Sequence, residues 1–134
     1  MNRKYYILTA VIFFVLGYSQ VSAQEIFEKW SALDEYHVIM SQTFHPAEND
    51  NLEAIKTKSG DLVEKANLLA KSPIPMEYNT EEIVATVKKL QKETKALDKL
   101  VSDKRSTDEQ IKQGIMGLHD VFQEIVGLCR KDDH

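Results

Sequence analysis

Apolar residues recur at intervals of three and four along four stretches of this chain, which is the spacing of one helix face. The first stretch begins at Ile26 and is expected to end before Pro46, because the residue before a proline avoids helical backbone angles. Its inward positions are Ile26, Trp30, Leu33, His37, Met40 and Phe44. A histidine therefore stands at a position where a leucine would be ordinary.

Three further stretches repeat the pattern, and each opens on a pair of residues suited to capping a helix. These pairs are Asp50 with Glu53, Asn79 with Glu82, and Ser106 with Glu109. The inward positions are Leu52, Ile55, Ser59, Leu62, Ala66 and Leu69, then Ile83, Val87, Leu90, Thr94, Leu97 and Val101, then Ile111, Ile115, Leu118, Phe122, Ile125 and Cys129. The sequence SPIP at 72–75 separates the second stretch from the third, because prolines interrupt helices.

Four amphipathic helices joined by short links predict an all-α fold, and specifically an up-down-up-down four-helix bundle. No segment shows the strict alternation that is typical of strands. In such a bundle the ends of the first and third helices meet the starts of the second and fourth at one end. We call this end the HPAEN pole, after the sequence at 45–49.

The chain begins with the pattern of a secretory signal peptide. A basic start precedes an apolar run that ends at Leu16, and small residues at Val21–Ala23 match a cleavage site after Ala23. The apolar run is shorter than the roughly 20 residues of a membrane span, which disfavours a retained anchor. We therefore expect residues 1–23 to be a cleaved signal peptide and residues 24–134 to be one bundle domain. The mature protein would be periplasmic or secreted, with no stable membrane span.

Charge and cysteine content exclude several classes of function. The formal net charge is −4, and removal of the two basic residues within 1–23 would take it to −6. Such a chain is a poor candidate for binding nucleic acid, which needs a basic face. Cys129 is the only cysteine, so no internal disulfide can form. We expect it to be a small buried core residue, and an intermolecular disulfide is the alternative.

Two inward-facing histidines are predicted to meet inside the bundle. With a rise of about 1.5 Å per residue, His37 lies about 12 Å from the HPAEN pole and His119 about 18 Å from it. Helical side chains lean toward the N-terminus of their own helix, so the two imidazoles approach one level from antiparallel helices. His134 is the last residue of the chain and is set aside as a frayed end.

Sulfur and nitrogen donors surround this meeting point. Met40 and Met116 each lie one turn from a histidine, and His45 is expected on the connecting loop, from which it could fold over the site. Imidazole with thioether suits copper, zinc or nickel, and it also suits haem iron. The predicted metal ligands are therefore His37, His119, Met40, Met116 and His45. The alternative is that the methionines and His37 only fill the core and that His45 caps the loop.

In architecture the chain resembles small exported four-helix bundles, namely the b-type and c-prime cytochromes and related periplasmic metal-binding bundles. The resemblance implies a haem or a metal ion held between helices. The b-type cytochromes ligate haem with a methionine of the first helix and a histidine of the last, and Met40 and His119 match these in kind. Met40, however, lies near the end of its helix. The absence of C-x-x-C-H leaves only non-covalent haem, and the absence of Glu-x-x-His excludes a di-iron bundle.

These observations favour an exported bundle that binds a transition metal or haem between its first and fourth helices, with copper or zinc as the leading metals. No serine lies beside a histidine and no carboxylates pair inward, so no enzyme activity is predicted. The alternative function is a ligand-free structural or protein-interaction bundle of the cell envelope. For a protein partner, the lysine-rich outer face at 87–105 offers a docking surface, unless i, i+4 pairs simply solvate it.

Overall fold

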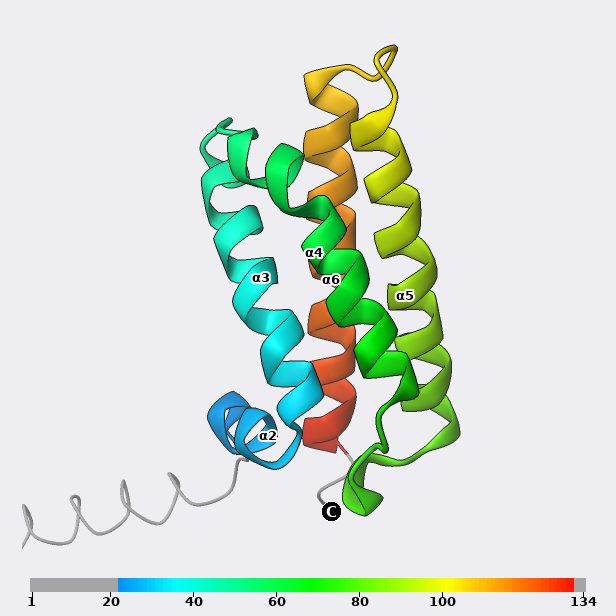
Figure 1. Ribbon diagram of the computed structural model, residues 1–134. Coiled ribbons are helices and arrows are strands. Elements are labelled where there is room, and N and C mark those ends of the chain that lie inside the picture. The colour runs from blue at the N-terminus through cyan, green and yellow to red at the C-terminus, as the bar shows by residue number, and fades with distance from the viewer. Residues whose placement is uncertain (1–21, 132–134) are drawn as a thin grey trace, which may run out of the picture.

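The computed structural model describes residues 22–131 as five α-helices and one short 3-10 helix (Figure 1). They are α2 (Ala23–Lys29), α3 (Ser31–Glu48), α4 (Glu53–Lys71), η1 (Met76–Tyr78), α5 (Glu81–Ser102) and α6 (Asp108–Lys131). No strand occurs within these residues, so the prediction of an all-α fold is confirmed. The predicted signal peptide falls almost entirely on residues outside the described part. No helix formed by residues 22–131 is long and apolar enough to cross a membrane.

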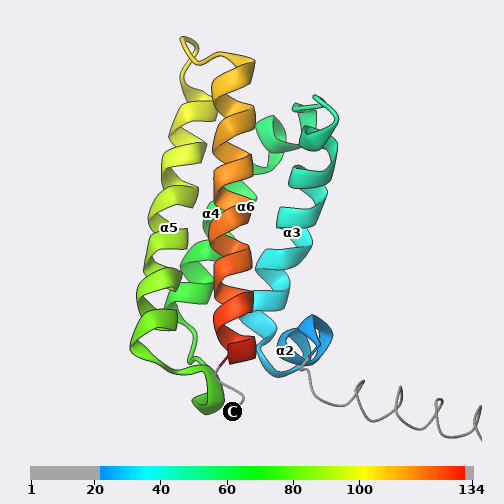
Figure 2. The same ribbon diagram turned by 180° about the vertical axis from the view of Figure 1, so that it is seen from behind.

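The long helices α3, α4, α5 and α6 lie side by side, and each packs against the next along the chain (Figures 1 and 2). α6 also packs against α3, and the short α2 lies across the lower ends of these two helices. α3 and α5 are on opposite sides of the molecule in both views. The turns at 49–52 and 103–107 lie at the upper end, which is the HPAEN pole.

The first predicted helix is two helices in the structure, so the prediction of four helices missed one. The break is at Trp30, whose φ of −126° and ψ of 82° are not helical. The Trp30 ring is buried and stacks on Tyr78, the last residue of η1, with ring centroids 6.2 Å apart. Periodicity could not reveal the break, because Ile26, Trp30 and Leu33 keep helical spacing across it.

Pro46 does not end the helix that contains it, which corrects the prediction. α3 continues through Pro46 to Glu48. Proline removes one helical N–H and crowds the preceding turn, but only Ala47 and Glu48 of α3 follow it. The Pro46 carbonyl then accepts hydrogen bonds from the backbone N–H groups of Asn49 and Asn51, each at 3.0 Å, and these close the helix end. His45 consequently lies in the last turn of α3, although a loop was expected there.

The helix starts differ slightly from the predicted caps. Thr80, one residue beyond Asn79, caps α5 through its side-chain oxygen. At α6 the capping box is formed by Thr107 and Gln110, which exchange hydrogen bonds of 2.9 and 3.1 Å one residue beyond the predicted pair. Leu52 precedes α4 and makes no side-chain cap, so the predicted capping box is absent there.

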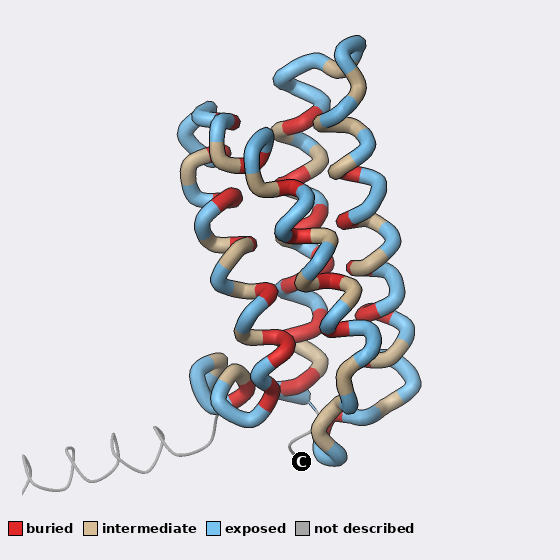
Figure 3. Tube along the Cα trace, in the orientation of Figure 1, coloured by how far each residue is buried: buried red, intermediate tan, exposed pale blue. Residues whose placement is uncertain are grey.

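Buried residues face the interior along the whole length of the long helices (Figure 3). Every predicted inward position of the second and fourth stretches is buried. The exceptions in the other two stretches are His37 and Val101, which are half-buried. Cys129 is completely buried, as expected for a small core residue, so an intermolecular disulfide would require the bundle to open.

Candidate metal site between α3 and α6

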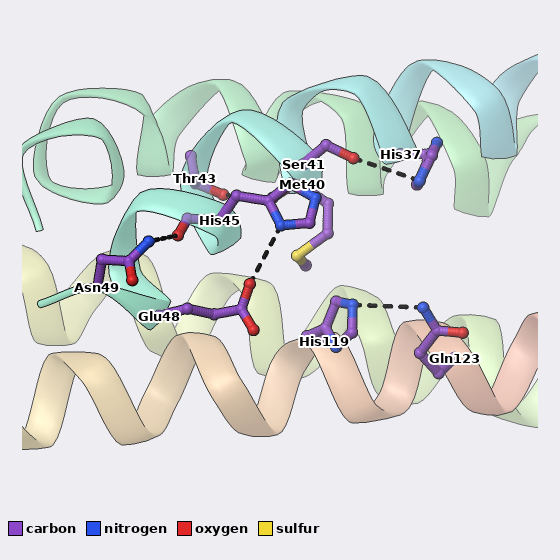
Figure 4. A network of polar contacts seen from close by, with 9 residues as sticks. All are labelled: His37, Met40, Ser41, Thr43, His45, Glu48, Asn49, His119 and Gln123. Carbon is purple, nitrogen blue, oxygen red and sulfur yellow. Dashed lines mark hydrogen bonds and ion pairs between the residues drawn. The ribbon is translucent and has the colours of Figure 1, made fainter. Parts of the chain in front are cut away.

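One side of α3 carries a row of polar side chains. His37, Ser41, His45 and Glu48 are spaced four, four and three residues apart, which places them on one helix face. Figure 4 shows this face opposite the part of α6 that carries His119. We call the region between these two helix faces the α3–α6 seam.

The His119 ring lies flat against an aromatic ring of α3. Its centroid is 3.6 Å from that of Phe44, and the two planes differ by only 4°. Burial is the main reason why the pKa of His119 is lowered, and positive charge on His45 and His37 lowers it further. Asp120 and Glu48 oppose this by raising the pKa.

His37 belongs to a stack of three aromatic rings. Its ring is nearly parallel to Phe27 of α2, at 4.4 Å, and to Phe122 of α6, at 5.4 Å. Its Nε2 atom is 3.3 Å from the Ser41 hydroxyl. Burial lowers the pKa of His37 from its ordinary value, which favours the neutral ring. This environment is that of a core residue at the edge of the bundle, and it leaves only the Nδ1 edge for a ligand.

His45 is held by a carboxylate of its own helix. Its Nδ1 atom is 3.1 Å from the Oε1 atom of Glu48. A proton on Nδ1 would donate to this carboxylate and leave the Nε2 lone pair available, which is the usual arrangement of a metal-bound histidine. Both side chains are largely exposed, at 69% for His45 and 48% for Glu48, so an ion could reach them from solvent.

The two methionines differ in burial and in their position relative to the α3–α6 seam. Met40 is 1% exposed, and Figure 4 shows its sulfur pointing into the space between the rings of His45 and His119. Met116 is half-buried against the core, one turn before His119 on α6. A thioether is a soft ligand that suits copper(I), but it also fills apolar space without strain.

Figure 4 shows His45 and Met40 of α3 on the side toward His119 of α6, whereas His37 lies two turns before His45, beside Ser41, and Met116 lies one turn before His119. Among residues 22–131, however, no three His, Cys, Asp or Glu side chains come close enough together to hold a metal ion. Asp50, in the turn after α3, accepts a hydrogen bond of 2.6 Å from Lys112. His134 lies outside the described residues.

Several contacts of the α3–α6 seam were not predicted from the sequence. Phe27 and Phe44 cover the histidine rings, and no local pattern marks such contacts because they join different helices. The contacts of Ser41 and Gln123 could have been predicted from the sequence, since each residue lies four positions after a histidine and therefore on the same helix face. The Gln123 amide nitrogen is 3.3 Å from Nε2 of His119, so it donates to that atom and places the His119 proton on Nδ1.

The fold and the seam define a small all-helical protein with histidine and methionine donors between its first and last long helices. No protein family, curated protein or solved structure matches the chain. The resemblance to exported cytochromes therefore stays a prediction that rests on architecture.

Proposed function

We propose that this protein is an exported up-down-up-down four-helix bundle that binds a transition-metal ion in the α3–α6 seam. In this interpretation α2 is an accessory to the first helix of the bundle. One observation carries the proposal: Figure 4 shows His45 and Met40 of α3 on the side of that helix that faces His119 of α6.

The donor set favours copper over zinc. The ligands would be Nε2 of His45, one nitrogen of His119 and the sulfur of Met40, with His37 and Met116 at the margins of the site. Burial lowers the pKa of His119, which favours the neutral imidazole that coordination requires. Two imidazoles and a thioether suit copper, whereas zinc prefers thiolate, imidazole or carboxylate.

A single ion fits this seam better than a haem. Phe44 lies against the face of His119 and Phe122 lies beside His37, so a macrocycle would have to displace at least one of these rings. A single metal ion would contact only the edges of the imidazole rings, where their nitrogen atoms lie. Rotation of the Gln123 amide would place its oxygen on Nε2–H of His119 and release Nδ1 as the ligand.

The first test is metal-dependent stability. At a copper concentration about 100 times the dissociation constant, the free energy of unfolding should rise by about 2.7 kcal/mol, because the ion binds only the folded chain. His45→Ala and His119→Ala should each abolish this rise, and the matched control His134→Ala should keep it. The rise should shrink as the pH falls below about 6.5, because protonated imidazole does not coordinate. Denaturant titrations with and without copper(I), copper(II), zinc and nickel measure it.

The competing function is a ligand-free structural or interaction bundle. The aromatic stack around His37 is what such a protein would need, since it packs the ring without using its lone pairs. In that case the metals would leave the unfolding midpoint of the wild type unchanged, and His37→Leu would stabilise the core by removing a partly buried polar group. A metal-induced rise that survives both His45→Ala and His119→Ala would also rule out the proposed site.

The proposed export leads to a prediction that does not depend on metal binding. Cleavage after Ala23 gives a mature chain that begins at Gln24 and lacks the Ser22 side chain that caps α2. Intact-mass measurement of protein from the envelope or the medium should find residues 24–134. A membrane-bound species that retains residues 1–23 would contradict the proposal.

A further inference from the structure

The outer face of α5 carries lysines without any acidic residue among them. Between positions 85 and 102, the exposed residues are Ala85, Lys88, Lys89, Lys92, Lys95, Ala96, Lys99 and Ser102. This concentration of positive charge occurs on a chain whose formal net charge is −4. We call Lys88, Lys92, Lys95 and Lys99 the lysine stripe.

The acidic residues of the same segment are turned away from the stripe. Asp98 accepts a hydrogen bond of 2.7 Å from Ser59 of α4, and Glu93 is half-buried with one carboxylate oxygen enclosed. Within the described part of the chain, no ion pair joins a stripe lysine to a carboxylate. The neighbouring Lys89 reaches Glu124 of α6 only at 4.0 Å. The i, i+4 pairs expected of a merely solvated face are therefore not formed.

The stripe is straight and polar. Its members are spaced four, three and four residues apart, which keeps them within a strip about 60° wide and about 16 Å long on one helix. The exposed large apolar side chains, Val38, Leu68 and Met76, all lie outside α5. A contact made by this face would consequently be electrostatic, without insertion of apolar groups.

We propose that the lysine stripe docks the folded protein on the surface of an anionic phospholipid bilayer. A straight row of ammonium groups on a convex helix touches a flat anionic plane with all its members at once, and clusters of four or more lysines are typical of such binding. α3 lies on the side of the molecule opposite α5, so docking would leave this wall of the α3–α6 seam facing solvent (Figures 1 and 2). The inference does not depend on metal binding.

The test is co-sedimentation of the purified, natively processed protein with lipid vesicles. The protein should bind vesicles of phosphatidylglycerol mixed with phosphatidylcholine at low salt, and binding should vanish near 1 M salt, where the Debye length is about 3 Å. Lys92→Gln combined with Lys95→Gln should lower the partition coefficient about thirtyfold. The matched control, Lys71→Gln with Lys131→Gln, changes the net charge equally at exposed sites outside the stripe and should lower it less than about threefold.

Three outcomes would overturn the proposal. Equal binding to pure phosphatidylcholine would mean that charge is not what holds the protein. If the stripe variant and the control lost vesicle binding equally, the net charge of the protein, and not the lysine stripe, would account for the binding. Binding to polyglutamate but to no vesicle would identify an acidic protein as the partner instead of a lipid surface.

Discussion

Replacing Phe122 with alanine should lower the free energy of unfolding by about 3–5 kcal/mol, the range found for large aromatic side chains in cores. Phe122 is 1% exposed, and its ring joins three helices. The centroid distances are 5.8 Å to Tyr36 and 5.4 Å to His37 on α3, and 6.2 Å to Phe27 on α2. Truncation would therefore leave a cavity that no single helix can close by moving. Urea denaturation followed by circular dichroism measures the loss.

A conservative substitution shows how much of the destabilisation comes from lost apolar volume. Phe122→Leu keeps most of the apolar volume and should cost less than about 1.5 kcal/mol. A loss under about 0.5 kcal/mol for Phe122→Ala would contradict the packing of α6 against α2 and α3. The alanine variant should also loosen His37, whose ring loses one of its two stacking partners.

Replacing Trp30 with alanine should cost a similar amount, about 3–5 kcal/mol. Trp30 lies at the junction of α2 and α3, is 2% exposed, and stacks on the ring of Tyr78 in η1. It thereby joins the beginning of the described chain to the connection between α4 and α5. Trp30 is the only tryptophan, so its fluorescence is lost with it and circular dichroism has to follow the unfolding.

The matched variant Trp30→Phe tests a second property of this residue. The indole N–H of Trp30 is buried and has no hydrogen-bond partner among residues 22–131. An unpaired buried donor costs about 1–3 kcal/mol, so its removal should offset much of the lost volume. We expect Trp30→Phe to lie within about 1.5 kcal/mol of the wild type. If phenylalanine destabilised the protein as much as alanine does, the indole nitrogen would have to be bonded in solution.

Which residues face the core could be predicted from the chain alone. The helical repeat is a property of the backbone, and a side chain repeated at that spacing faces one direction whatever surrounds it. The inward positions of α4 and α6 are accordingly all buried, including the polar Ser59 and the lone Cys129. For the candidate site, the spacing predicted that His37 meets His119, whereas the His119 ring stacks on Phe44 and the His37 ring stacks on Phe27 and Phe122.

The tertiary structure decided where these helices break and what each histidine contacts. The bend at Trp30 depends on Tyr78, which is distant in sequence, and the continuation of α3 past Pro46 depends on hydrogen bonds from the following turn. That continuation carries His45 onto the helix and beside Glu48. No local pattern encodes such contacts, because their free energy arises only when separate segments pack together, and it can outweigh the backbone preference of a single residue.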